Sequence, residues 1–388
     1  MHRPTKQTIH VQPSWIQRSL GYFILAIIFI IFYILNQQLA KQLPHQTTYA
    51  EYPNETIYQA KVDQITDQTT ETIEQTPYIK QSLTLTILNG DRKGEILNNI
   101  TNQVPSYSQQ ILTTQDKVIL GALQDETGDF YYIIDRYRGD IVLIAIAMFL
   151  ITLTLVIGKE TLPSLIGLTI SFYVLIQLIT PFITYGYSPI IITIIGTLII
   201  IPFTFYISHG FNSKTTVSVI ATLSTLAIMS LISTWFVTQA HLSNLSTESL
   251  LTLLTIPELQ FNFQGLLIAG IIISALGILD DVTISQASVV EQLHKTKTFT
   301  SFKNLYTQSL RVGKDHIASA INTLILVYAG ASLPTLLLLT RYPRPNTVLF
   351  NNELIVSEIL IAILSTMAII IAIPITTALA SGYYLKKE

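Results

Sequence analysis

The sequence predicts a polytopic α-helical membrane protein, of about eight transmembrane helices, with a small extracytoplasmic β-rich domain. Three observations lead to this fold class. Hydrophobic residues make up 49% of the 388 residues and charged residues only 12%, whereas a typical soluble domain carries about 25% charged residues. Most of the apolar runs reach the roughly 17 to 20 residues that cross a bilayer. A long polar stretch with strand-like alternation follows the first apolar run.

The first apolar run, residues 20–35, follows a basic tail, residues 1–19. A basic start and an apolar run are also features of a cleaved signal peptide. Because no small-residue cleavage site follows the run, we interpret 20–35 as a transmembrane signal anchor and 1–19 as a cytoplasmic tail. Cleavage after the run is the alternative.

Residues 36–138 are rich in Thr and Gln and form the predicted extracytoplasmic β-rich domain. Residues 82–88 alternate between apolar and polar side chains, as a half-buried strand does. The tetrad 89–92 contains Asn-Gly and predicts a turn, after which residues 94–97 begin the return strand. One β-hairpin is therefore expected here.

A second hairpin is predicted from residues 117–123 and 130–134, joined by a turn at 125–128. Several short strands in one polar segment favour a small β-barrel or sandwich. The domain has no recognisable ligand or catalytic-triad spacing, so we interpret it as a structural or partner-binding module.

Residues 139–388 form the predicted seven-helix transmembrane domain, and with the anchor they make eight spans. The polar residues after the fifth of these apolar runs are read as a continuation of that helix. The seven candidate spans are 141–157, 162–183, 189–207, 215–237, 264–279, 316–340 and 354–380.

The distribution of Lys and Arg predicts the orientation. If the N-terminus is cytoplasmic, twelve of these residues lie on the cytoplasmic side, in the tails and short loops. Only Arg341 and Arg344 then lie in short loops on the other side. We therefore expect a multi-pass protein of the cell membrane with both termini in the cytoplasm.

Several polar side chains are predicted to lie at one depth in the membrane. Asp280 lies sixteen residues after Gln264, which is about 24 Å along a helix at 1.5 Å per residue. Counting inward from Arg341 places Asn322 at about 28 Å by the same rise. Asn212 follows the end of the span 189–207. These groups should therefore lie in the cytoplasmic third of the bilayer.

Helical spacing places Asp281, Ser285 and Ser288 on one helix face, and Asp315, Ser319 and Asn322 on a face of another helix. A charge near the bilayer centre costs about 3 kcal/mol on insertion scales. We therefore expect the two faces to meet each other or to line a water-filled cavity. The alternative is that the aspartate pair caps a half-helix, since Asp favours helix N-termini.

Carboxylate, hydroxyl and amide oxygens suit a hard monovalent or divalent cation, or a proton. Which metal, if any, would bind is left open by the residues. The candidate ion- or substrate-binding residues are Asp280, Asp281, Ser285, Ser288, Asp315, Ser319, Asn322 and Asn212.

Three stretches also resemble a known family. Residues 209–216 (HGFNSKTT), 277–294 (GILDDVTISQASVVEQLH) and 311–334, which begins RVGKDHIAS and ends AGASLP, are similar to the YibE/F family of bacterial multi-pass membrane proteins. The resemblance covers about residues 139–340, and the polar domain fits the family's layout more loosely. The resemblance implies a bacterial inner-membrane protein, and it indicates neither a reaction nor a substrate.

The leading functional hypothesis is a secondary transporter or permease for a small ion or solute, with a polar site near the cytoplasmic side. The alternative is a non-transporting assembly or sensor protein whose outer β-domain binds a partner. We expect no enzymatic activity. The net charge of −2 gives no electrostatic reason for nucleic-acid binding. The expected partners are membrane lipids, the transported species, and a second copy of the chain or another membrane subunit.

Overall fold

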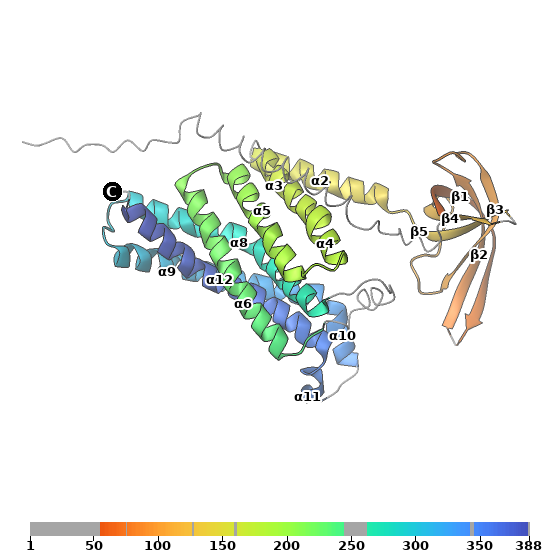
Figure 1. The fold of residues 1–388 in the computed structure, drawn as a ribbon. Helices are drawn as coiled ribbons and strands as arrows, with labels where there is room; N and C mark the ends of the chain where they lie inside the picture. The colour runs from red at the N-terminus through yellow and green to blue at the C-terminus, as the bar shows by residue number, and fades with distance from the viewer. Residues whose placement is uncertain are drawn as a thin grey trace, which may run out of the picture. The chain divides into compact units, whose positions relative to one another are not determined.

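The computed structural model describes residues 55–74, 76–125, 128–158, 161–243, 262–341 and 345–386. The predicted tail and anchor, residues 1–35, lie outside them. The chain divides into two compact units, of which one spans Pro44–Lys159 and the other contains Glu160–Glu388 (Figure 1).

The first unit contains a curled antiparallel sheet of five strands in the order β3-β2-β1-β4-β5. The two predicted hairpins are confirmed as β2–β3 and β4–β5. Both Gly90 and Gly94 in the first turn have positive φ, of 77° and 91°, which glycine adopts without steric cost. The strands are β1 Glu55–Ile73, β2 Thr76–Ile87, β3 Ile96–Pro105, β4 Lys117–Asp125 and β5 Gly128–Arg136.

The expected barrel or sandwich is a single sheet that curls until its edge strands, β3 and β5, approach each other. Alternate residues of each strand face the inside of the curl. Leu83 and Leu85 of β2 are fully buried there in one cluster with Val62 of β1 and Val118 of β4. Strand periodicity thus produces one apolar core for this unit.

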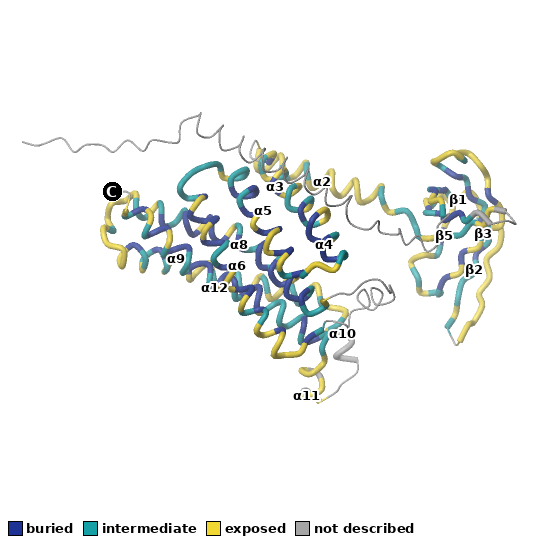
Figure 2. Tube along the Cα trace, in the orientation of Figure 1, coloured by how far each residue is buried: buried dark blue, intermediate teal, exposed yellow. Residues whose placement is uncertain are grey.

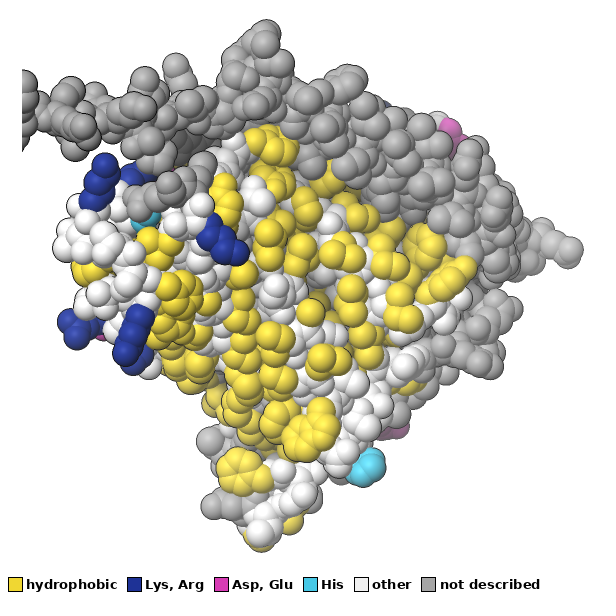
Figure 3. All heavy atoms as spheres, turned by 60° about the vertical axis from the view of Figure 1, so that its left-hand side comes forward, with side chains coloured by type: hydrophobic (Ala, Val, Ile, Leu, Met, Phe, Trp, Pro, Cys, Tyr) yellow, Lys and Arg dark blue, Asp and Glu magenta, His cyan; other side chains and the backbone are white. Residues whose placement is uncertain are grey.

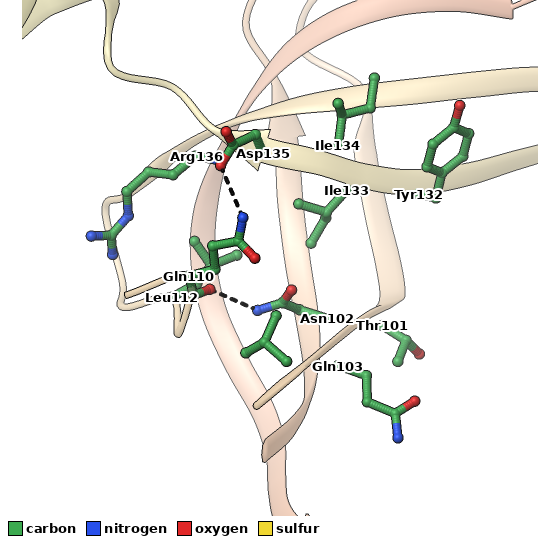
Figure 4. Close-up of a pocket in the computed structure, with 11 residues that line it drawn as sticks. Thr101, Asn102, Gln103, Gln110, Leu112, Tyr132, Ile133, Ile134, Asp135 and Arg136 are labelled. Carbon is green, nitrogen blue, oxygen red and sulfur yellow. Dashed lines mark hydrogen bonds between the residues drawn. The ribbon is translucent and has the colours of Figure 1, made fainter. Parts of the chain in front are cut away.

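A cavity of about 300 Å³ lies in the seam between β3 and β5 (Figure 4). Several of its polar side chains are hydrogen-bonded to each other or to neighbouring residues. Asn102 donates to the carbonyl oxygen of Gln110 at 3.1 Å and to Gln81 at 3.0 Å. Gln110 in turn donates to Asp135 at 3.5 Å, and Arg136 donates to Asp116. These bonds close the seam, so we read the cavity as part of the domain's internal packing.

The helical elements follow the sheet. They are α2 Gly139–Ile157, α3 Thr161–Val174, the π-helix η2 Leu175–Ile179, α4 Thr180–Thr184, α5 Pro189–His209, α6 Ser213–Gln239, α8 Phe263–Lys295, α9 Phe302–Ala331, α10 Leu333–Arg341, α11 Asn346–Leu349 and α12 Glu353–Lys386.

Six helical segments in the described part of the chain are long and apolar enough to cross a membrane. They are α2, the segment Thr161–Thr184, α5, α6, α8 and α12. The expected span 316–340 is not among them: α9 already begins at Phe302 and ends at Ala331, and α10 begins at Leu333. Pro334 accounts for the break, because it has no N–H to donate to the carbonyl oxygen of Gly330 four residues earlier.

The second unit packs around α8, which contacts α5, α6, α9 and α12. Figure 2 shows buried residues along α8 and on the facing sides of α6 and α12. Apolar side chains spread over the face of this unit that Figure 3 shows, and basic side chains gather at one end of it. An apolar outer surface is what a helix bundle presents to lipid.

Candidate functional site

Helix α8 is unbroken from Phe263 to Lys295, so both aspartates lie inside it. The N-cap of this helix is Asn262, whose side chain accepts a hydrogen bond from the backbone N–H of Gly265 at 2.8 Å. The alternative that the aspartate pair caps a half-helix is therefore wrong, because no helix begins near Asp280.

The face of α8 that carries Asp281 and Ser285 points outward. Both residues are exposed, and Ser288 is half-buried with its hydroxyl bonded to the carbonyl oxygen of Ile284 at 2.8 Å. Gly277, one turn earlier, is also exposed, and a Cβ atom added there would meet nothing within 4 Å. This face of α8 is unoccupied by any described residue at that point.

The predicted face of α9 points outward too. Asp315, Ser319 and Asn322 are all exposed. Within the described residues, no hydrogen bond links them to Asp280 or Asp281. Each set shares an outward helix face, as its spacing predicts.

The hydrogen bonds between α8 and α9 show which residues of the two helices lie side by side. The hydroxyls of Ser274 and Tyr328 are hydrogen-bonded at one end of the contact. At the other end, Nε2 of Gln286 donates to the carbonyl oxygen of Ser309 at 3.0 Å. The helices are therefore antiparallel, and the aspartates, midway between Ser274 and Gln286, lie level with about residues 317–319 of α9. The apolar side chains packed between these two bonds include Ile278, Val282, Ile317, Ala320 and Leu324.

Asn212 has a local role. It is the N-cap of α6, where its Oδ1 accepts from the backbone N–H and the hydroxyl of Thr215 at 2.9 and 3.0 Å. Its Nδ2 donates to the carbonyl oxygens of His209 and Gly210 at 2.8 and 3.2 Å. Since both ends of the amide are engaged at the helix start, the structure gives Asn212 a capping function.

Asp280 differs from Asp281 in its surroundings. It is half-buried, and its Oδ1 is enclosed without a hydrogen-bond partner. One turn away on either side, Leu276 and Ile284 are buried in the large apolar cluster that α8 forms with α5 and α6. Asp280 is thus a carboxylate directed toward the protein interior.

A buried polar cluster lies on the face of α8 that the sequence analysis left out. Gln286 is 3% exposed. Its Nε2 donates to the carbonyl oxygen of Ser309 on α9 at 3.0 Å and to the hydroxyl of Thr377 on α12 at 2.7 Å. Gly313 of α9 lies so close that a Cβ atom there would be 2.8 Å from Oε1 of Gln286. One amide therefore joins three helices.

A second set of buried bonds joins α8 to α6. The hydroxyls of Thr222 and Thr283 are 2.9 Å apart, and Ser218 donates to the carbonyl oxygen of Thr283 at 3.2 Å. All three residues are fully buried. The hydroxyl residues of α6 recur every three or four positions, which is the signal that could have marked this face.

The described residues contain no group of three or more His, Asp or Glu that could hold a metal ion. A cation in this unit would instead meet hydroxyl, amide and carbonyl oxygens, with Asp280 as a half-buried carboxylate on α8. Such oxygens suit hard cations and protons.

Comparison with known proteins adds one finding. The family model described as YibE/F-like protein matches residues 145–386, which include α5, α6, α8, α9 and all of α12. No curated protein and no solved structure matches the chain. The match includes every residue of the buried polar clusters.

Proposed function

Because the chain belongs to the YibE/F-like family and its described residues contain six helical segments of membrane-crossing length, we propose that it is a multi-pass permease, a secondary transporter for a small ion or solute. The observation that carries this proposal is a set of buried polar groups, with the half-buried Asp280 among them, inside a bundle of membrane-crossing helices. Polar and ionisable groups inside membrane helices are costly, and they mark ion and substrate pathways.

Hydroxyl and amide bonds between helices also have a purely structural use, since they hold membrane helices together. Asp280 favours transport over that use. Its enclosed Oδ1 has no hydrogen-bond partner, so this oxygen joins no helices and its burial costs free energy. A carboxylate in this state fits transient binding of a proton or a cation.

The proposed orientation places both termini in the cytoplasm and the β-sheet unit outside. Five exposed basic residues lie between the end of α8 and the middle of α9, on one side of the expected bilayer. An excess of Lys and Arg in short loops is typical of the cytoplasmic side. These residues are Lys295, Lys297, Lys303, Arg311 and Lys314.

The test is ion flux in proteoliposomes, measured for Na⁺, K⁺, Mg²⁺ and protons in turn. The variants are Asp280→Asn and, as a matched control, Asp281→Asn. The two residues are adjacent and chemically identical, but only Asp280 is directed inward. We expect Asp280→Asn to lower flux about tenfold or more, equivalent to about 1.4 kcal/mol, and the control to stay within about twofold of wild type. Wild-type flux no higher than in protein-free liposomes would refute the permease.

A second candidate function is a non-transporting assembly subunit. The exposed face of α8 favours it, because small and polar residues on a membrane helix are typical of helix–helix contacts. Gly270 and Gly277 are open on this face, and Asp281 and Ser285 are exposed. We infer that another membrane chain, either a second copy or a different subunit, would cover it. A cysteine at Gly277 should then form a cross-linked homodimer or heterodimer in membranes, whereas exclusively monomeric protein would contradict the inference.

A further inference from the structure

Helix α9 lies at the edge of the helical unit, where it packs mainly against α12 and α8. Its buried residues are Leu305, Ser309 and Gly313, which all lie on one side of the helix. Asn322 follows Gly313 by nine residues, which places it about 180° away around the helix at 100° per residue. Asn322 is exposed, so α9 has an outward face directly opposite its packed face.

The residues of this outward face follow a heptad pattern. Intervals of four and three residues alternate along it, as they do between the a and d positions of a parallel helix pair. All but the last of its residues are exposed, and the last is half-buried. We call this set the α9 seam, which consists of Arg311, Asp315, Ala318, Asn322, Ile325 and Ala329.

The polar residues of the α9 seam have no partner among the described residues. The amide of Asn322 forms no hydrogen bond there, and Arg311 and Asp315 form no ion pair. Asn322 lies between Ser309 and Tyr328, the two residues that bond α9 to α8, and hence beside a membrane-crossing helix. Lipid tails offer no hydrogen bonds to such an amide. Another protein surface would satisfy it.

We propose that the α9 seam is a two-fold interface between two copies of this chain. Two copies inserted in the same orientation are related by an axis along the membrane normal, so their α9 helices are parallel and level. Asn322 then faces the second copy's Asn322. A carboxamide has both donors and an acceptor, so it is complementary to itself. In the heptad Asn322 occupies an a position, where one Asn specifies the register of a parallel pair.

Charge favours a second copy over a different subunit. Arg311 and Asp315 are one helical turn apart and opposite in sign, so Arg311 of each copy can pair with the second copy's Asp315. The seam as a whole carries no net charge, and two copies do not repel each other. Ala318 and Ala329 are small, which lets membrane helices approach closely. The interface lies on α9, not on the exposed face of α8, and it does not depend on the permease function.

The first experiment is disulfide cross-linking of the full-length chain, which has no native cysteine, in proteoliposomes. Ile325→Cys places a thiol in the seam, and Val327→Cys is the matched control. The two residues are 51% and 59% exposed, and they lie about 200° apart around α9. Oxidation with copper phenanthroline should convert Ile325→Cys mainly to dimer and leave Val327→Cys mainly monomeric.

The second experiment measures the dissociation constant of the dimer, by energy transfer between labelled copies as the lipid-to-protein ratio is raised. Asn322→Ala should raise this constant about tenfold. Thr323→Ala is the control and should leave it unchanged. Thr323 is adjacent and exposed but lies outside the seam, and its hydroxyl bonds within its own helix, to the carbonyl oxygen of Ser319 at 3.1 Å.

A charge exchange tests whether the seam pairs with itself. Arg311→Asp and Asp315→Arg should each weaken the dimer, because like charges then meet across the axis, and the two variants should associate with each other when mixed. Three outcomes overturn the proposal: equal cross-linking of Ile325→Cys and Val327→Cys, an unchanged dissociation constant for Asn322→Ala, or a mixture that associates no better than either charge variant alone.

Discussion

Replacing Gly313 by alanine should damage the contact between α8, α9 and α12. A Cβ atom at this position would lie 2.5 Å from Cγ2 of Ile373, 2.8 Å from Oε1 of Gln286 and 3.2 Å from its Cδ. Carbon atoms in optimal contact are about 3.5–4.0 Å apart. Ile373 or Gln286, or both, must therefore move.

The expected loss follows from these contacts. Overpacking a well-packed core costs about 1–3 kcal/mol. Movement of Gln286 also removes its two interhelical bonds, each worth about 0.6 kcal/mol in a membrane bundle. The change from glycine to alanine in a helix returns about 1 kcal/mol. The net effect of Gly313→Ala is a destabilisation of about 1–3 kcal/mol.

Gly330→Ala is the matched control. This glycine lies in the same helix, is exposed, and has nothing within 4 Å of an added Cβ atom. The substitution should therefore be neutral or stabilise by up to about 1 kcal/mol. The assay is the apparent Tm of both variants in detergent at one scan rate, because large membrane proteins commonly unfold irreversibly. Equal Tm values for the two variants would show that the close approach at Gly313 does not exist.

Three further predictions follow from other parts of the molecule. Asn212→Ala should destabilise by about 1 kcal/mol through loss of the α6 cap, and Asn212→Asp should restore it; identical Tm values for both would contradict the capping role. In the first unit, burial tends to raise the pKa of Asp116, but hydrogen bonds from Thr113 hold that pKa below its usual value. The contribution of ionised Asp116 to the stability of this unit is thus present above about pH 4 and lost as pH falls through the lowered pKa. Urea unfolding of residues 44–138 should show this loss and Asp116→Asn should reduce it, whereas an unchanged pH dependence would argue against it. Finally, the chain has no cysteine, so single cysteines at Ser82 and Ser301 can report topology: an impermeant thiol reagent should label only the first from outside, and labelling of both would refute the orientation.

The sequence alone determined the class of the protein and much of its local structure. Long apolar runs predicted the six segments of membrane-crossing length in the described residues, because the bilayer requires about 20 apolar residues, but the prediction was wrong for 316–340. Turn residues predicted both hairpins of the sheet, and Gly90 belongs to the first of these turns. Helical spacing correctly grouped Asp281 with Ser285, and Ser319 with Asn322, on shared faces. Counting the helical rise predicted that the aspartates lie beside the middle of α9.

The sequence left the direction of each helix face undecided. In a soluble helix, polarity marks the outer face, but lipid is as apolar as a protein core. Polar residues around α8 therefore looked alike: Ser285 and Gln286 are neighbours in the chain, yet one is exposed and the other is 3% exposed. Only the approach of α9 and α12, from far along the sequence, distinguishes them.

Tertiary structure also decided the role of single residues. Asn212 belongs to a helix cap because His209 and Thr215 are folded back onto it. The partners of Gln286 lie 23 and 91 positions away along the chain, beyond the range of any helical or strand period. Local periodicity determines which residues share a face of one helix. The packing of the other helices determines which of its faces is buried. The buried polar site of this protein is therefore a property of the bundle.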